Sequence, residues 1–132
     1  MKMLTCAAAL LSATLLAGCD PGGGGTPAQP TPGVLTVKLA APVLGDRALV
    51  IAITGPGEVS AVQPAVAGYV TYVRTQGAAT RVAVFGTIEA GPVLRFSVPD
   101  TRQQYQAAVV DAADGNNTAR TNMAAYQLEI LR

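Results

Sequence analysis

The chain lacks histidine and tryptophan entirely, and only two of its 132 residues are cysteine. Histidine is the usual general base of nucleophile–base pairs, and it is a common zinc ligand. Without it, the Ser-His and Cys-His pairs of hydrolases cannot be built. Beyond the N-terminal segment the only serines are Ser60 and Ser97, and Lys38 is the only lysine that could serve as a base. We therefore predict that the protein has no catalytic residues, binds no zinc and is not an enzyme.

Charge is scarce as well, because only 13% of the residues are charged and the formal net charge is +1. Binding of nucleic acid would call for a clustered basic face, and a polybasic membrane patch would call for a run of lysine and arginine. Neither is present, so we expect no nucleic-acid partner. The acidic residues are also scattered, and most lie near predicted turns, which does not favour the paired carboxylates of a glycosidase.

The longest apolar run in the chain lies at its N-terminus. Lys2 is followed by residues 3–17, which are interrupted only by Thr5, Ser12 and Thr14. A positive start and a short apolar core are the layout of a secretory signal peptide. A run of about 15 residues is too short to span roughly 30 Å of hydrocarbon comfortably. We expect no transmembrane helix in the mature protein.

The apolar run closes on Leu16, Ala17, Gly18 and Cys19. These four residues resemble the lipobox of bacterial lipoprotein precursors. The resemblance implies a signal peptide at residues 1–18, cleavage after Gly18, diacylglycerol on the Cys19 thiol and usually a further acyl chain such as palmitate on the new amine. Two or three acyl chains anchor a protein stably, because each buried CH₂ contributes ~0.8 kcal/mol. The alternative is an ordinary secretory signal with a chance cysteine.

This resemblance also bears on location and on cofactors. It implies a membrane-anchored protein of the bacterial envelope, facing the periplasm or the exterior. Asp20 resembles the inner-membrane retention signal of enterobacterial lipoproteins, but it is equally typical of a linker, so inner and outer membrane both stay open. Cys6 would leave with the signal and Cys19 would carry lipid, so no disulfide is expected. Apart from the covalent lipid, the sequence predicts no cofactor.

Residues 19–33 follow the apolar run as a segment rich in glycine and proline. It contains four consecutive glycines and almost no apolar side chains, so it cannot form a hydrophobic core. We expect a flexible tether there, and a coil of about 14 residues spans roughly 20 Å. Removing residues 1–18 from the 132-residue chain leaves 114, which is enough for this tether and one small domain at residues 34–132.

Apolar residues alternate with polar ones through most of residues 34–132. A period of two is typical of β-strands with one buried face, and turn signals recur about every ten residues. We predict a single antiparallel β-sandwich of seven or eight strands, an all-β fold. The strands are expected at 34–39, 49–53, 58–66 (an edge strand interrupted by Pro64), 69–75, 81–85, 93–98, 105–109 and 126–130, with one short helical turn within 118–125.

One part of this domain resembles a known family. Residues 98–100, 105–109 and 111–115 are similar to the penultimate strand and following loop of a fibronectin type III domain. The resemblance covers about 20 residues and implies an immunoglobulin-like sandwich in which Tyr105 forms the tyrosine corner, its hydroxyl bonding to backbone a few residues upstream. The tryptophan usual in an early strand of that family is missing here. The alternative role for Tyr105 is that of a plain core tyrosine.

Two further groups of residues are weak candidates for sites. Asp111, Asp114 and Asn116, with Asn117 beside them, offer oxygen ligands around a glycine, as calcium requires, although their spacing is not that of an EF-hand. Ordinary hairpin chemistry explains the same residues. Tyr69 and Tyr72 are three positions apart, so a regular strand directs them to opposite faces. One of them is expected to be exposed, where it could stack on a sugar.

Two hypotheses on function remain. The favoured one is a lipid-anchored, non-catalytic sandwich that contacts another envelope protein. It rests on five residues that alternation places on outer faces although they are apolar: Ala48, Val50, Ala52, Ala83 and Phe85. If such a face is exposed it is a contact patch, and if it is covered it is core. The second hypothesis is a module that binds a glycan or small ligand through Tyr69 or Tyr72 beside Arg74.

Overall fold

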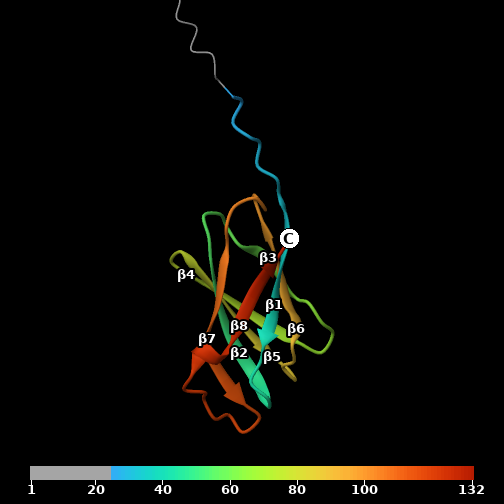
Figure 1. Cartoon of the computed structure of the whole chain (residues 1–132), viewed down its shortest axis with the longest axis vertical. Coiled ribbons are helices and arrows are strands. Elements are labelled where there is room, and N and C mark those ends of the chain that lie inside the picture. The colour runs from blue at the N-terminus through green and yellow to red at the C-terminus, as the bar shows by residue number, and fades with distance from the viewer. Residues whose placement is uncertain (1–24) are drawn as a thin grey trace, which may run out of the picture.

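The computed structural model of the chain describes residues 25–132. The proposed signal peptide, the lipobox residues Leu16 to Gly18 and the lipidation site Cys19 lie outside the described residues. In the described part, eight strands form two four-stranded antiparallel sheets that pack against each other (Figure 1). The antiparallel β-sandwich predicted from the sequence is thereby confirmed. No helix within residues 25–132 is both long enough and apolar enough to cross a bilayer.

The first sheet contains β3, β6, β1 and β8 in that order, and the second contains β4, β5, β2 and β7. The eight strands and one 3₁₀ turn, η1, have these bounds: β1 Gly33–Ala41, β2 Asp46–Thr54, β3 Ser60–Pro64, β4 Val70–Gln76, β5 Ala79–Phe85, β6 Gly91–Val98, β7 Gln106–Asp114, η1 Met123–Ala125 and β8 Gln127–Leu131. The strand expected around Pro64 is indeed an edge strand, and the strand expected around Arg81 is interior. The short helical turn falls within the predicted range.

The pairing of the strands follows one scheme along the whole chain. β1 pairs with β8, β2 with β7, β3 with β6 and β4 with β5. The four strands of the first half thus pair with the four strands of the second half in reverse order, as in one long antiparallel ribbon. The further pairs β1·β6 and β2·β5 connect strands of this ribbon into two sheets. In immunoglobulin domains the first two strands share a sheet, whereas here β1 and β2 lie in different sheets. The likeness to immunoglobulin domains is one of architecture and not of strand order.

The core lies between the sheets and is built by the alternation seen in the sequence. Leu35, Val37 and Leu39 of β1 are at most 1% exposed, and they face the similarly buried residues of β2. Phe96 of β6 fills the centre and meets Tyr105 edge-to-face at 6.0 Å. Because each such side chain contributes roughly 1.5–3 kcal/mol when it is buried, alternation over six or more residues fixes which face of each strand turns inward.

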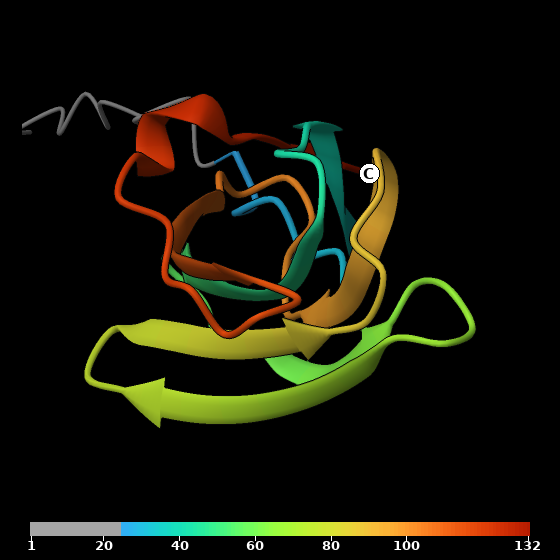
Figure 2. The ribbon, with the colours of Figure 1, turned by 90° about the horizontal axis from the view of Figure 1, so that it is seen from below.

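The two sheets do not cover each other completely. β3 spans only five residues, whereas β4 beyond it spans seven. Figure 2 shows the β4–β5 hairpin as a long layer at one side of the sandwich, with β4 at its outer margin. As a result Val73, whose register partner Val82 belongs to the core, is itself 50% exposed. β4 is therefore exposed along its length, and only Thr71 in it is half-buried.

Candidate functional site

The outer face of the first sheet is mostly polar. Most of its outward positions hold hydroxyl, amide and charged side chains, among them Thr36, Lys38, Arg95 and Glu129. Val34 and Leu131 are the exposed large apolar side chains on this face. Lys38 and Glu129 are register partners on β1 and β8, and their charged atoms lie 3.5 Å apart. A half-exposed pair of this kind adds little stability.

The outer face of the second sheet is apolar, in contrast. Val70 and Tyr72 on β4 face the same way as their register partners Phe85 and Ala83 on β5. The ring of Tyr72 meets that of Phe85 edge-to-face at 5.9 Å, yet Tyr72 is 65% exposed and Phe85 44%. The next strand continues the face with Val50, opposite Ala83. The outward positions predicted from alternation are thus confirmed. Phe85 is exposed there, whereas Ala48, Val50, Ala52 and Ala83 are half-buried.

A β-bulge in β7 extends the apolar surface. The register runs from Val50 opposite Asp111 directly to Ile51 opposite Val109, so Val110 is the extra residue. Val110 is 41% exposed, while Val109 is buried. Bulges re-aim side chains at sheet edges and next to binding sites. We call the surface formed by Ala48, Val50, Val70, Tyr72, Ala83, Phe85 and Val110 the apolar patch.

Positive charge borders this patch on one side. Arg74 of β4 and Arg81 of β5 are register partners on the same outer face, and both are exposed. The three ion pairs found among residues 25–132 involve other arginines and Lys38. Like charges placed opposite each other destabilise a sheet by a fraction of a kcal/mol up to about 1 kcal/mol. A costly arrangement of this kind favours a role in contacting something acidic.

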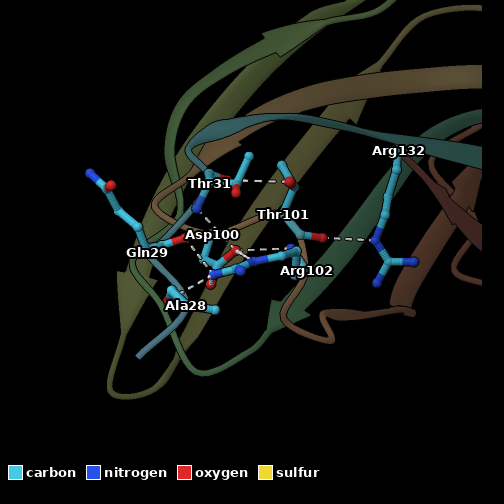
Figure 3. A network of polar contacts seen from close by, with 7 residues as sticks. All are labelled: Ala28, Gln29, Thr31, Asp100, Thr101, Arg102 and Arg132. Carbon is cyan, nitrogen blue, oxygen red and sulfur yellow. Dashed lines mark hydrogen bonds and ion pairs between the residues drawn. The ribbon is translucent and has the colours of Figure 1, made fainter. Parts of the chain in front are cut away.

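A polar network fastens the end of the tether to the sandwich (Figure 3). Asp100, in the loop between β6 and β7, accepts hydrogen bonds from Arg102 Nε at 3.0 Å and Arg102 Nη2 at 2.9 Å. The same guanidinium donates to the carbonyl of Gln29 at 2.7 Å and to that of Ala28 at 3.2 Å. The backbone N–H of Thr31 donates to Asp100 Oδ1 at 3.2 Å. Residues 28–31, expected to belong to a free tether, are therefore held.

The C-terminus lies at the same end of the molecule (Figure 1). Arg132 Nε donates to the carbonyl of Thr101 at 2.8 Å, and the N–H of Thr101 donates to the carbonyl of Thr31 at 2.8 Å. We call Thr31, Asp100, Thr101, Arg102 and Arg132 the tether clamp. Hydrogen bonds from Arg102 hold the pKa of the Asp100 carboxyl well below its usual range. The clamp sets the point at which the chain enters the sandwich.

A second polar cluster lies inside the opposite end of the sandwich. Asp46 at the start of β2 is 1% exposed, and it accepts hydrogen bonds from the hydroxyl of Tyr126 and from Arg120 Nε, the latter at 2.8 Å. Burial, and then the bond to Asp46, raise the pKa of Tyr126 to about 12. Because every polar atom of Asp46 has a partner, we assign the cluster to stability.

Tyr105 is buried as predicted, but the expected corner hydrogen bond is not formed. Its hydroxyl has no hydrogen-bond partner among residues 25–132. The ring instead lies against Gly55, and the hydroxyl lies beside Gly57 and Pro99, where a Cβ on Gly57 would stand 2.5 Å from the oxygen. Tyr105 therefore packs closely against two glycines, and its hydroxyl forms no corner hydrogen bond. Tyr105 is a core tyrosine, packed on Phe96.

The candidate calcium ligands serve the turn in which they lie. Asp114 Oδ1 accepts the N–H of Asn116 at 2.8 Å and that of Thr118 at 3.0 Å, and these bonds lower the pKa of Asp114. Asp111 Oδ1 accepts the N–H of Ala112 at 2.9 Å. Asn117 closes the turn at a φ of 60°. Within residues 25–132 no three acidic or thiol side chains converge on a position suited to a metal ion.

The two candidate tyrosines differ as the sequence suggested. Tyr69 lies just before β4, its hydroxyl accepts the N–H of Glu89 at 3.2 Å, and its ring packs over Gly86. Tyr72 is exposed on the same face of β4 as Arg74. Tyr69 therefore has a structural role, and Tyr72 is the exposed aromatic side chain that the glycan hypothesis requires.

The hollows found among residues 25–132 are open rather than enclosed. One groove of about 560 Å³ runs between the edge strands β7 and β8, lined by apolar Leu128 and Ile130 and by polar Gln104 and Gln106. No acidic side chain lines it. It therefore offers no acid–base pair for chemistry on a bound molecule.

Sequence reasoning missed both polar networks. Asp100 and Arg102 are two residues apart in a loop, and Asp46 follows Gly45 between two predicted strands, so nothing in the sequence links them to Gln29 or Tyr126. A comparison of the chain with protein-family models, with curated proteins and with solved structures gave no match. What the protein does is therefore inferred from its own residues.

Proposed function

We propose that this protein is a lipid-anchored protein of the bacterial envelope whose sandwich contacts another envelope protein without catalysing a reaction. The apolar patch is the observation that carries the proposal. The same chain builds a mostly polar outer face on its first sheet, where Val34 and Leu131 are the exposed large apolar side chains, so low overall charge does not explain the apolar face on the second. Exposed aromatic side chains on an apolar surface with a charged border are typical of protein contacts.

The chemistry of the patch also describes the partner. Arg74 and Arg81 border the apolar side chains, so the complementary surface would present apolar groups beside carboxylates. Charge complementarity of this kind speeds encounter and fixes the orientation of the two proteins. The aromatic pair of Tyr72 and Phe85 would supply most of the binding energy, since interface energy concentrates in a few large side chains.

The tether clamp supports a role close to a membrane. If Cys19 carries lipid, the chain between the anchor and the clamp consists of residues 20–27. A glycine-rich chain of that length would span about 16 Å, against roughly 20 Å for a tether that ran freely to residue 33. The clamped end would then stand near the bilayer. The apolar patch, which runs along the side of the sandwich, would face other proteins of the same membrane.

Site-specific photocrosslinking in the native cells tests this proposal. A photoreactive residue at Ala83, in the apolar patch, is compared with one at Thr36, on the polar outer face, in the full-length chain. We expect one dominant protein adduct from position 83, lost on Tyr72→Ser with Phe85→Ser and weakened in Cys19→Ser. Equal adducts from both positions, or none from position 83, would contradict a contact through the patch.

The glycan-binding alternative is kept because Tyr72 is exposed beside Arg74. It predicts that the protein is retained on cell-wall polysaccharide and that Tyr72→Ala abolishes this retention. Phe85→Ser, on the neighbouring strand, is the matched control. It alters the apolar patch, and so the protein contact, but leaves Tyr72 in place. Retention that survives Tyr72→Ala would exclude the glycan site.

A further inference from the structure

The free edge of β4 is the basis of this inference. Gly77 has a φ of 60°, and the two residues Gly77 and Ala78 join Gln76 to its partner Ala79, as in a type II′ hairpin turn. The turn bond makes Gln76 and Ala79 a hydrogen-bonded pair. Since the direction of the backbone groups alternates along an antiparallel strand, the N–H and C=O of Thr71, Val73 and Thr75 point away from β5. β4 ends its sheet, and no described strand pairs with that edge.

This edge lacks the protection that the other three edges carry. Proteins prevent edge pairing with proline, bulges, short strands or charge. β3 ends at Pro64 and has an irregular register, β7 has the bulge at Val110, and β8 has only five residues with Glu129 at its centre. β4 has seven residues in unbroken register, contains no proline and carries one charge. Its side chains are rich in β-branched and aromatic residues, which favour strand pairing.

The sequence of this edge is complementary to itself. In an antiparallel pair of two β4 strands centred on Val73, Val73 lies opposite its own copy and Thr71 opposite Thr75. All of the outward N–H and C=O groups named above then find partners. Tyr72 lies opposite Arg74, which places a guanidinium beside an aromatic ring on the outer face. Moving the centre to Arg74 would place two arginines opposite each other, and moving it to Tyr72 would leave Thr75 outside the set of paired residues.

We propose that a second copy of this chain pairs with β4 in this register and joins the two second sheets into one sheet of eight strands. The half-exposed side chains of Val73 from the two copies would cover each other on the inner face. The two apolar patches would become continuous. The pairing itself does not depend on the proposed envelope partner, because it uses the strand edge and not the outer face.

We expect the association to be weak in solution. One strand edge is small beside the roughly 1,200–2,000 Å² that stable complexes bury. Two copies held in one membrane would meet at a higher effective concentration, which would strengthen the pairing. That strengthening, unlike the pairing, rests on the proposed lipid anchor.

A disulfide trap in the full-length protein tests the register. Directly opposed, hydrogen-bonded residues of antiparallel strands have Cα atoms about 5.5 Å apart, within the range of a disulfide. Val73→Cys should give a covalent dimer under mild oxidation in detergent and in vesicles. Val110→Cys, similarly exposed on another edge strand, is the matched control, and the unsubstituted chain measures any dimer formed through its own cysteines. Equal trapping of both variants would overturn the proposal.

A proline pair tests the backbone bonds. Val73→Pro removes an N–H that points outward, so the fold should persist while self-association in sedimentation falls by about tenfold. Tyr72→Pro removes an N–H that bonds to β5 and should lower the melting temperature instead. Self-association that is unchanged by Val73→Pro would overturn the proposal, and so would trapping of Val73→Cys on a different protein in cells. Neither result bears on the photocrosslinked adduct from position 83 that tests the proposed function.

Discussion

Tyr126, immediately before β8, donates its hydroxyl hydrogen to the buried carboxylate of Asp46 at the start of β2. The two residues are 80 positions apart, and the strands β2 and β8 beside them lie in different sheets, so the bond ties the two layers together at one end. Arg120 completes the cluster by donating to Asp46 Oδ1 at 2.8 Å and to the carbonyl of Leu44 at 3.2 Å. A buried carboxylate without such partners would be costly, so each donor matters to stability.

Two Tyr→Phe variants should therefore differ sharply. Tyr126→Phe leaves a buried carboxylate with one donor fewer and should lower the free energy of unfolding by about 1–3 kcal/mol. Tyr105→Phe removes a buried hydroxyl that has no partner, so it should be neutral or slightly stabilising. Urea denaturation of both variants measures the difference. Equal losses in the two would contradict the assigned roles.

Alkaline pH should unfold the protein partly through Tyr126. Its pKa is raised to about 12, from an ordinary value of 10, because burial and the bond to Asp46 disfavour the phenolate. The folded state thus keeps a proton that the unfolded state loses between these values. The stabilising contribution is complete below pH 10 and is lost as the pH rises toward 12. The drop in unfolding free energy from pH 9 to 11.5 should be smaller in Tyr126→Phe, and an identical drop would refute this cause.

The strands were predictable because alternation in the sequence and burial in the fold have the same origin. Leu49, Ile51 and Ile53 recur at every second position, and all three are fully buried. The outward-facing Ala83 and Phe85 were found in the same way, since one face of a strand determines the other. Four of the five residues singled out from the sequence belong to the apolar patch, whereas Ala52 lies opposite Arg81 beyond it. The bulge that adds Val110 became visible only through the register.

The polar networks could not be predicted, because they depend on which loops meet. The contact between Arg102 and Gln29 joins residues 73 positions apart, and that between Asp46 and Tyr126 joins residues 80 apart. No periodicity encodes such distances. The corner bond expected for Tyr105 failed for a related reason, since the paths of Gly55 and Gly57 beneath the ring follow from the sandwich as a whole.

The approach of Gly55 to Tyr105 gives a steric prediction. A Cβ at Gly55 would lie 2.6 Å from Tyr105 Cε1, so the ring or the turn must move. Gly55→Ala should cost about 1–3 kcal/mol, as overpacking of a core does. Gly115→Ala is the control, because its Cβ would meet Arg47 Cγ at an ordinary 3.4 Å and should change stability by less than about 0.5 kcal/mol. Thermal melting that ranks the two variants in the opposite order would contradict the geometry.

The tether clamp should be separable from the fold. Arg102→Ala removes both side-chain hydrogen bonds to Asp100 and those to Ala28 and Gln29. Amide hydrogen exchange at Thr31 and Thr101 should therefore quicken, while that of Ile51 in the core stays slow. Arg102→Lys should give an intermediate result, because an ammonium cannot reproduce the two-point contact of a guanidinium. Arg95→Ala, on the polar outer face, should change none of these amides.

Acid should release the clamp in the unsubstituted chain as well. The pKa of Asp100 is depressed by its bonds to Arg102, so its stabilising contribution is present above the ordinary value of 3.8 and is lost as the pH falls below it. Exchange at Thr31, corrected for the intrinsic effect of pH, should therefore quicken below pH 3.8 in the unsubstituted chain and show no such change in Arg102→Ala. Equal protection of Thr31 in the two proteins at neutral pH would show that the contacts of Arg102 do not hold the tether.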